Sequence, residues 1–474
     1  MNRVVGLETE YGCLVLQDER PGGPDALPVR VKNHLFQNAR YGLIDLHYRD
    51  YEEPPGNGGF LLNGGRLYLD MGHLEFATPE CLTVRDVVSY ERAGDWLLQR
   101  ALEEMGLAEK VAFIKNNVDH VTGATFGCHE NYLMKRTAPF TPQVLAALLS
   151  FLATRQIYTG AGRVGQANPL AFEFEGHRAE KRVPFQISQR ADHIVNDIYQ
   201  WVQFNRAIIN ARDEPLADYR KYRRLHLLIG DSNMNSHTTA LKVGTTAMVL
   251  DLLEENIVPK RVALMDPVQA TRDISRDLSG RWLVRLDNGQ VRSALEIQHA
   301  FLSLAQHYLA GADPEYDWLL GEWEAVLTGL EEDPMSQVAK VDWVAKKWML
   351  EMFMESEGIG WDDPWLQSLD LEYHNLNRRT GLYHALEEQG RVQPLVSWDR
   401  VAFCATTPPA NTRAQARGLA VRQLMGRGRQ YIINWDSLRL EDREPLLMTN
   451  PFHTYHAELS QLLASSPDSS GETR

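Results

Sequence analysis

Hydrophobic alternation near the start of the chain predicts a strand with acidic side chains on one face. The segment "RVVGLETEYG" (residues 3–12) places Glu8 and Glu10 two positions apart, with Leu7 and Thr9 at the alternate positions. Because side chains alternate across a strand, the glutamates share one face while Leu7 and Thr9 share the other. This pattern predicts either a solvated polar face or two carboxylates that hold a cation.

The same pattern of carboxylates recurs in the next predicted strands. "RLYLD" (66–70) places Tyr68 and Asp70 on one face, and "GHLEF" adds His73 and Glu75 two positions apart. Carboxylates that pack together repel each other unless protons or cations lie between them. Mg²⁺ takes oxygen ligands from carboxylates and from substrate phosphates. A solvated face explains one isolated pair of glutamates, but the recurrence favours a magnesium site.

Histidines and arginines follow a similar alternation further along the chain. "GCHENYL" places His129 and Asn131 on one strand face, and "RRLHLLIGDSN" does the same for Arg224 and His226. Arg212 lies in a turn of the segment "INARDEP". Arginine forks bind phosphate oxygens, so these residues favour a nucleotide site beside the acidic face. The alternatives are structural histidines and a local salt bridge between Arg212 and its acidic neighbours.

The remaining pattern predicts a mixed fold. Residues 13–60 contain much proline and glycine and are predicted to be irregular, whereas residues 84–106 have helical spacing with Gly106 as a stop signal. Residues 290–390 are mostly helical in pattern. After residues 405–418, a turn-rich entry into a short helix, "YIINWDSLRL" is predicted as a strand and "TYHAELSQLLA" as a helix.

These elements predict an α+β protein with two domains and a tail. We expect a large domain over residues 1–400, a small C-terminal α+β domain over residues 401–465, and a disordered polar tail over residues 466–474. The apolar content of 44% and the charged content of 24% are typical of a soluble globular protein.

Charge and cysteine content exclude several classes of function. The formal net charge of −14 argues against broad binding to nucleic acid or to an anionic membrane, and the apolar runs are too short to span a bilayer. "GAGRVG" (160–165) lacks the spacing of known phosphate loops. No C-x-x-C pair indicates a zinc or redox motif, so reduced thiols in a cytoplasmic protein are predicted. The cysteines are Cys13, Cys81, Cys128 and Cys404.

Long segments of the chain resemble one known family. "GLETEYG", "NGGRLYLDMGHLEFATPEC", "KNNVDHVTGATFGCHENYL", "INARDEPLADYRKYRRLHLLIGDSNM", "LKVGTTAMVLDLLE" and "PPANTRAQARG" are similar to the family of the Pup–protein ligase and its sister, the Pup deamidase or depupylase. The resemblance covers nearly the whole chain. It implies a glutamine-synthetase-like large domain, in which a curved antiparallel sheet cradles ATP and Mg²⁺, with a small C-terminal domain at one end.

The resemblance also implies roles for individual residues. By motif match, Asp70 corresponds to the catalytic aspartate, and Glu8, Glu10, Tyr68 and Glu75 to the surroundings of the magnesium and the phosphates. Seven further residues match nucleotide- and phosphate-binding segments, namely His129, Asn131, Arg212, Arg224, His226, Arg413 and Arg417.

Within the family, the resemblance favours the ligase over its sister. "DLSGRWLVRLDNG" and the ending "TNPFHTYHAELSQLLAS" resemble the ligase, while "GAGRVG" and "LEEDPMSQVAKVDW" resemble the depupylase. The implied activity is ATP-dependent joining of the C-terminal glutamate of a disordered Pup-like modifier to lysines of protein substrates. The alternatives are hydrolysis of the same bond, a small-molecule carboxylate–amine ligase, and a catalytically silent binding protein. The sequence leaves the oligomeric state open.

Overall fold

A sheet of ten strands forms the centre of the described part of the chain. Only the β10–β11 pair is parallel, and the other paired strands of this sheet are antiparallel, which confirms the predicted antiparallel character. The computed structural model describes residues 1, 3–16, 26–49, 53–120, 122–165, 183–200, 206–441 and 443–464. The strands follow the spatial order β10 (Asn196–Tyr199), β11 (Ala207–Asn210), β12 (Tyr222–Leu227), β7 (Cys128–Lys135), β1 (Val5–Val15), β5 (His73–Ala77), β4 (Arg66–Asp70), β3 (Gly58–Leu61) and β2 (Gly42–Ile44), and β6 (Val111–Ile114) also pairs with β1.

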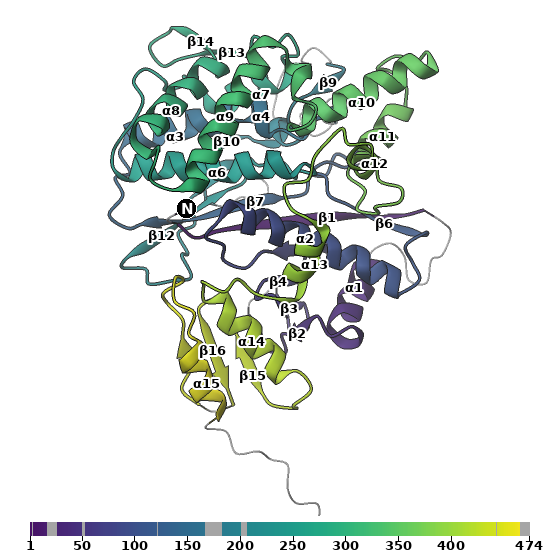
Figure 1. Ribbon diagram of the computed structural model, residues 1–474, viewed down its shortest axis with the longest axis vertical. Helices are drawn as coiled ribbons and strands as arrows, with labels where there is room; N and C mark the ends of the chain where they lie inside the picture. Colours follow the sequence, from purple (N-terminus) through teal and green to yellow (C-terminus); the bar gives the residue numbers. More distant parts are fainter. Residues whose placement is uncertain are drawn as a thin grey trace, which may run out of the picture.

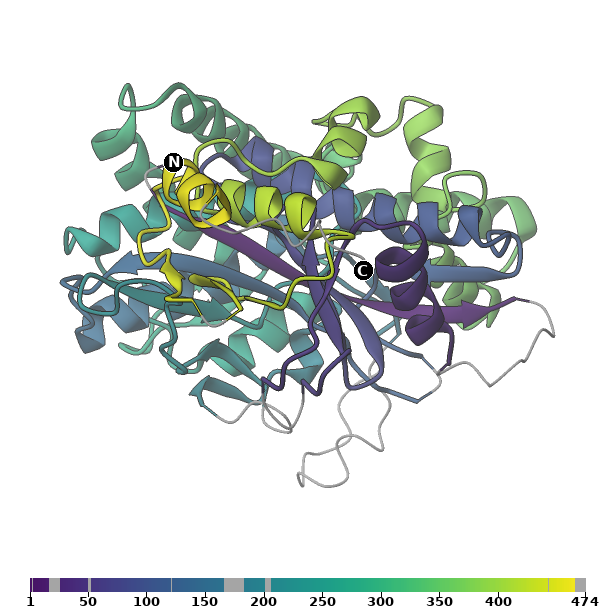
Figure 2. The same ribbon diagram turned by 90° about the horizontal axis from the view of Figure 1, so that it is seen from below.

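Strand β1 organises the sheet because it pairs with β5, β6 and β7. Figure 2 shows this long purple strand running across the molecule. Burial alternates along it: Leu7 and Thr9 are buried, whereas Glu8 and Glu10 on the other face are partly exposed. The alternation predicted for this strand is therefore confirmed.

In Figure 1, α3, α6, α8 and α9 lie above β7 and β12, away from the small C-terminal unit, whereas α1, α2 and α13 are drawn below β1, nearer to that unit. Helix α6 packs on β7, and α2 packs on β1 and α6. The α-helices of the large unit are α1 (Ala26–Asn33), α2 (Val84–Glu104), α3 (Pro142–Thr154), α4 (Gln156–Thr159), α6 (Ser236–Glu254), α7 (Pro267–Arg276), α8 (Ala294–Leu309), α9 (Pro314–Glu332), α10 (Asp342–Glu357), α11 (Trp365–Tyr373), α12 (Leu382–Glu388) and α13 (Trp398–Thr406). The shorter elements are the π-helix η1 (His34–Asn38), the 3₁₀-helices η2 (Ala191–His193) and η3 (Pro334–Gln337), and the strand pairs β8 (Arg163–Val164) with β9 (Phe185–Gln186) and β13 (Leu283–Arg285) with β14 (Val291–Ser293).

Among the described helices, none has the length and apolar character needed to cross a membrane.

Helix α2 follows its predicted signals. The Thr83 side chain caps its N-terminus by accepting a hydrogen bond from the Asp86 amide, and Gly106 adopts a positive φ of 68° just past its end. The prediction that residues 13–60 are irregular is wrong where α1, η1 and β2 form. There, Leu27, Val31 and Leu35 recur every four residues and are buried in the main core, a helical period that the flanking prolines and glycines obscured.

A small unit with its own core follows the large one. Residues from Ala416 to Leu459 form a second apolar cluster, to which Phe60 of β3 also belongs. The predicted boundary after residue 400 falls inside α13, whose Cys404 and Ala405 pack into the main core. "YIINWDSLRL" is two paired strands rather than the single strand predicted. The elements are α14 (Ala414–Leu424), β15 (Tyr431–Ile433), β16 (Ser437–Leu440), β17 (Leu446–Leu447) and α15 (His456–Ala464).

The predicted disordered tail, residues 466–474, lies outside the described residues.

Candidate active site

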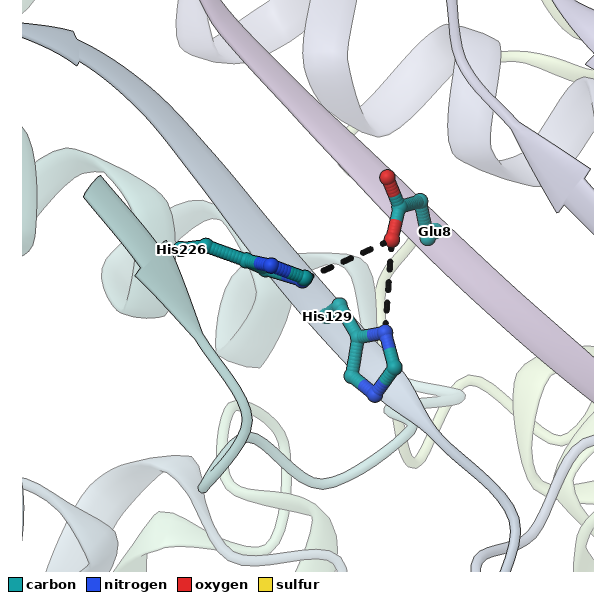
Figure 3. A group of neighbouring side chains, drawn as sticks. All are labelled: Glu8, His129 and His226. Atoms are coloured by element: carbon teal, nitrogen blue, oxygen red, sulfur yellow. Dashed lines mark hydrogen bonds and ion pairs between the residues drawn. The ribbon is translucent and has the colours of Figure 1, made fainter. Parts of the chain in front are cut away.

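Glu8 lies between two histidines on the neighbouring strands β7 and β12 (Figure 3). His129 Nδ1 lies 3.3 Å from Glu8 Oε2, and His226 Nε2 lies 3.7 Å from the same oxygen. Asn131 donates a hydrogen bond to the other oxygen, Oε1, at 3.1 Å. These contacts follow from register, because Glu8 pairs with His129 across β1 and β7, and His226 pairs with Asn131 across β12 and β7.

Glu10 belongs to a second cluster, composed of carboxylates. Ligand oxygens of Glu10, Asp70 and Glu75 lie within 4.8 Å of one another. Register again brings them together, since Glu10 pairs with Glu75 across β1 and β5 and Tyr68 pairs with Glu75 across β4 and β5. The Tyr68 hydroxyl donates a 2.6 Å hydrogen bond to Glu75 Oε1. The two glutamates that share one face of β1 thus serve two adjacent clusters.

The two clusters differ in electrostatics. Burial and the nearby charges of Glu8 and Glu10 raise the pKa of Glu75 well above its usual value. Burial alone raises the pKa of Glu8, but the hydrogen bond with His129 and the proximity of His226 outweigh it and hold this pKa below its usual range. Burial lowers the pKa of His226 to about 3, so its imidazole is neutral and able to act as a ligand.

The donor atoms fit divalent cations. The cluster of Glu10, Asp70 and Glu75 offers oxygen atoms alone, as Mg²⁺ prefers, and a cation there would remove the repulsion that raises the pKa of Glu75. The cluster of Glu8, His129 and His226 offers one carboxylate and two imidazoles, which suit a softer divalent ion better than Mg²⁺.

A cavity of about 140 Å³ lies next to Glu8, between the sheet and the small unit. Asn131 and Arg224 line it from the sheet, and Arg413 and Trp435 line it from the small unit. Arg224 Nη1 lies 3.5 Å from Asn131 Oδ1. The structure therefore brings three of the sequence-predicted nucleotide-binding residues, Asn131, Arg224 and Arg413, to one cavity beside Glu8.

Two other arginines that the sequence predicted to bind nucleotide do not line this cavity. The Arg212 side chain is 57% exposed and its Nε lies 2.8 Å from Glu214 Oε1, so it makes the local salt bridge considered as the alternative. Arg417 is fully buried and binds both carboxylate oxygens of Glu80. Arg413 also donates to Glu80, through Nε at 2.6 Å.

No sequence pattern predicted a role for Arg190 or Arg206. Arg190 is buried, donates hydrogen bonds to Thr125 Oγ1 and to the Phe126 carbonyl, and lies near both Arg206 and Glu10. A single arginine in an irregular segment has no periodicity to mark it, so only the fold reveals that it lies beside the carboxylate cluster.

Known proteins match this chain over nearly its whole length. The family model "Pup-ligase protein" matches residues 3–439. The chain is 37% identical over 479 residues to a Pup–protein ligase of Kineococcus radiotolerans, covering 98% of this chain and 99% of that one. It is 35% identical over 477 residues to a Pup–protein ligase of Nocardioides sp., covering 97% and 99%.

Solved structures agree over the same length. The crystal structure of the complex between prokaryotic ubiquitin-like protein Pup and its ligase PafA matches with a TM-score of 0.84 and 31% identity, covering 98% of this chain and 91% of that one. The Pup ligase PafA in complex with ADP matches with a TM-score of 0.77 and 32% identity, covering 96% and 95%. The chain therefore belongs to the Pup-ligase protein family.

Proposed function

We propose that this protein is an ATP-dependent ligase that joins the C-terminal glutamate of a Pup-like modifier to lysine side chains of proteins. One observation of the structure carries the proposal: Asp70 lies in a carboxylate cluster with Glu10 and Glu75, and Glu8, which shares a strand face with Glu10, lines a cavity together with arginines. A charged phosphoryl group can be transferred only where cations neutralise it, and this arrangement provides both cation ligands and arginines.

The relatives support both substrates of this reaction. One similar structure is a ligase in complex with Pup, and another is a Pup ligase in complex with ADP. We assign the nucleotide to the cavity between the sheet and the small unit, with its phosphates toward Glu8. Asn131, Arg224 and Arg413 would contact it there, while Trp435 offers an aromatic surface to a base.

Magnesium would be held by Glu10 and Glu75, with Tyr68 orienting Glu75 through its hydrogen bond. Glu8, with His129 and His226, would hold a second cation at the phosphate end of the nucleotide. Bound there, the metal would offset the negative charge that develops on the transferring phosphoryl group. Arg190 and Arg206, near Glu10, would contribute to the same charge balance from the protein side.

The chemistry proceeds in two steps. In the first, a side-chain oxygen of the modifier's terminal glutamate attacks the γ-phosphorus of ATP, and ADP leaves with the electrons of the broken P–O bond. In the second, the lysine amine attacks the acyl phosphate carbon and inorganic phosphate leaves. Asp70 accepts the proton of the attacking amine, since an ammonium group cannot act as a nucleophile.

The modifier is expected to be a disordered chain that orders on binding, and its lysine-bearing targets are expected to be marked for proteasomal degradation. The four cysteines are free thiols in the structure, which supports the predicted cytoplasmic location.

Product balance tests the proposal against hydrolysis of the same bond. Wild-type protein is mixed with ATP, magnesium, a glutamate-ended modifier and a lysine-bearing protein, and ADP and conjugates are counted. The ligase forms about one ADP for each isopeptide bond. Cleavage of preformed conjugates over many turnovers, without matching ADP, would overturn the ligase in favour of the depupylase.

A further inference from the structure

Gly127 lies directly before β7, at a place in the sheet where a side chain would point into the candidate active site. Its carbonyl accepts a hydrogen bond from the Glu10 amide at 3.1 Å, which continues the pairing of Thr9 with Cys128 and places Gly127 opposite Glu10. Because side chains alternate along a strand, position 127 shares a face with His129. A side chain here would therefore lie between the two clusters, since Glu10 belongs to one and His129 to the other.

The space that such a side chain would fill lies between two ligand atoms. A Cβ atom on Gly127 would lie 2.5 Å from Glu10 Oε1 and 2.6 Å from His129 Nε2, closer than real Cβ atoms approach their neighbours. Carboxylate oxygen and imidazole nitrogen are both metal ligands. The Nδ1 edge of His129 faces Glu8 (Figure 3), and its Nε2 faces this gap. The gap above Gly127 is thus the place where the two clusters meet.

The backbone does not require glycine at this position. Gly127 does not have a positive φ, so an L-amino acid can adopt its conformation. The nearest atoms that a Cβ would overlap belong to the ends of two flexible side chains, Glu10 and His129. At Gly58 in β3, by contrast, a Cβ would overlap the backbone of the neighbouring strand β4. Glycine at position 127 therefore serves the space above the strand rather than the fold of the strand.

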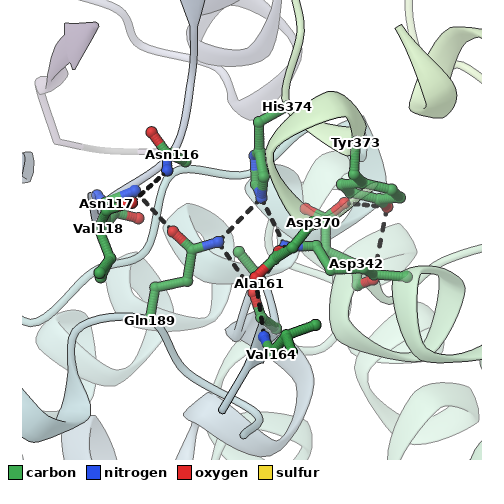
Figure 4. A network of polar contacts seen from close by, with 12 residues as sticks. Asn116, Asn117, Val118, Ala161, Val164, Gln189, Asp342, Asp370, Tyr373 and His374 are labelled. Carbon is green, nitrogen blue, oxygen red and sulfur yellow. Dashed lines mark hydrogen bonds and ion pairs between the residues drawn. The ribbon is translucent and has the colours of Figure 1, made fainter. Parts of the chain in front are cut away.

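The backbone at Gly127 is held in place by a buried network. The Phe126 carbonyl accepts from Arg190 Nη1 at 2.6 Å and from Asn117 Nδ2 at 2.9 Å, and the Phe126 amide donates to the Asn117 carbonyl at 3.0 Å. The Asn117 amide in turn donates to Gln189 Oε1 at 2.6 Å (Figure 4). A methyl group at position 127 would therefore displace the two ligand side chains rather than the strand.

We propose that Gly127 is a positioning residue for phosphoryl transfer, because it leaves the gap between Glu10 and His129 open for the γ-phosphoryl group of ATP. This inference rests on the proposed function and adds a residue that acts through its lack of a side chain. Two cations about 3.5–4 Å apart can hold the oxygens of one phosphoryl group between them. The two clusters can each contribute a cation to the same group only if Glu10 and His129 keep their positions beside the gap.

ADP and ATP should respond differently to a methyl group at this position. ADP has no γ-phosphoryl group, so its binding depends on the cavity beside Glu8. In Gly127→Ala with Mg²⁺, the dissociation constant of ADP should change less than about threefold, whereas that of a non-hydrolysable ATP analogue should rise about tenfold or more. The burst of ADP formation from ATP and a glutamate-ended modifier should slow by about 10²-fold, the cost of misplacing reacting groups by about 1 Å.

A matched control separates the gap from the general effect of replacing a glycine. Gly12 lies in β1, and a Cβ there would come no closer than 3.7 Å to its neighbours Asn116 and Ile114. Gly12→Ala should therefore match wild type in both affinities and in the burst rate. Gly127→Ala should melt within about 2 °C of wild type, because alanine restricts the unfolded chain and this offsets the displacement of two side-chain ends.

A measurement on wild-type protein keeps the inference testable even if Gly127→Ala does not fold. Mn²⁺ accepts the same oxygen ligands as Mg²⁺ and is detected by electron paramagnetic resonance. With the ATP analogue, two Mn²⁺ ions on either side of one phosphoryl group would lie about 4 Å apart and should give a spin-coupled spectrum. With ADP, which lacks the shared group, this coupling should be lost.

Several outcomes would overturn the inference. Equal losses of affinity for ADP and for the ATP analogue in Gly127→Ala would assign the gap to another part of the nucleotide. Unchanged affinities and burst rate would show that the gap is not used, and a markedly lower melting temperature with losses for every ligand would make Gly127 structural. Uncoupled Mn²⁺ in wild-type protein with the ATP analogue would overturn it without any variant. Absence of conjugation by the wild type, by contrast, would contradict the proposed function itself.

Discussion

Two groups of charged residues in this molecule are built in opposite ways. In the cluster of Glu10, Asp70 and Glu75, like charges crowd together and the pKa of Glu75 is raised by burial and by its neighbours. Around Glu80, one carboxylate binds Arg413 and Arg417 together. The first group gathers carboxylates that a cation from outside would neutralise, whereas the second pairs its carboxylate with cations of the chain itself.

This difference separates a binding site from a structural joint. Arg417 also donates to the carbonyls of Gly64 and Trp435, so the Glu80 cluster connects the sheet region to the small unit. Arg413 and Arg417 are buried and share the carboxylate of Glu80 as their counter-charge. The cluster is therefore stable only while Glu80 is ionised. Arg413 additionally lines the cavity beside Glu8, so it connects the joint to the nucleotide end of the proposed site.

The largest effect is expected from Asp70→Asn, which removes the proposed base and keeps the shape of the side chain. Lysine conjugation should fall by about 10³-fold. ADP should still form in a burst of about one per active site, because phosphorylation of the modifier does not need this base. Rapid-quench measurement of ADP and of conjugates checks both. Asp362→Asn, at an exposed position, is the control and should match wild type. Conjugation within tenfold of wild type would contradict the assignment.

The next largest effect is expected from breaking the structural joint. Glu80→Gln leaves Arg413 and Arg417 buried without a counter-charge, so the free energy of unfolding should drop by about 3–5 kcal/mol. Urea unfolding measures it, with Glu388→Gln, an exposed site, as the control. A drop in the free energy of unfolding below about 1 kcal/mol would show that Arg413 and Arg417 do not depend on the charge of Glu80, so the contrast with the carboxylate cluster would fail.

The same joint has a pH signature. Burial raises the pKa of Glu80, but Arg417 and Arg413 outweigh it and lower the pKa to about 2. A carboxyl group with a depressed folded pKa stabilises the protein above its unfolded pKa, and this stability is lost as the pH falls toward the folded value. We therefore expect wild-type protein to lose stability between about pH 4.5 and pH 2, and Glu80→Gln to lose less over that range.

Some features of the site follow from neighbouring residues in the chain, and these could be predicted from the sequence. Others depend on residues that are neighbours only in the folded structure, and these could not. Alternation along β1 and β4 was enough to predict that Glu8 shares a strand face with Glu10, and that Tyr68 shares one with Asp70. It could not show that Glu8 and Glu10 serve different clusters, because that follows from the register with β5 and β7.

The arginines illustrate the same limit. Arg413 and Arg417 lie four residues apart, a spacing that would suit an anionic ligand, but their common partner Glu80 is more than 300 residues away in the chain. Arg163 was part of a motif that matched no known phosphate loop. Its Nε and Nη1 have no hydrogen-bond partner among the described residues, and this becomes visible only when the fold shows which groups bind the carboxylates around it.

A smaller effect, of opposite sign to that of Glu80, is expected from Glu75→Gln. With its folded pKa raised, Glu75 binds a proton more tightly in the folded state than in the unfolded one. Without divalent cations, its contribution to stability should therefore fall as the pH rises from its unfolded pKa through its folded pKa. Glu75→Gln should remove this slope while keeping an oxygen to accept from Tyr68. Thermal unfolding measured across pH in the presence of a chelator tests this prediction. If the stability of Glu75→Gln depended on pH as steeply as that of the wild type, repulsion among these carboxylates would not explain the pH dependence.

The smallest effect is expected from the exposed arginine of the proposed nucleotide region. Arg212 pairs with Glu214 at the surface, and exposed ion pairs contribute at most about 1 kcal/mol, so Arg212→Ala should change the KM for ATP by less than about threefold. Arg224 lines the cavity next to Asn131, and Arg224→Ala should raise the same KM about tenfold, since charge-assisted hydrogen bonds to phosphate are stronger. Steady-state kinetics at saturating modifier compares the two variants. If Arg212→Ala had the larger effect, the phosphates would lie toward the exposed turn, and the cavity beside Glu8 would lose its assignment as the nucleotide site.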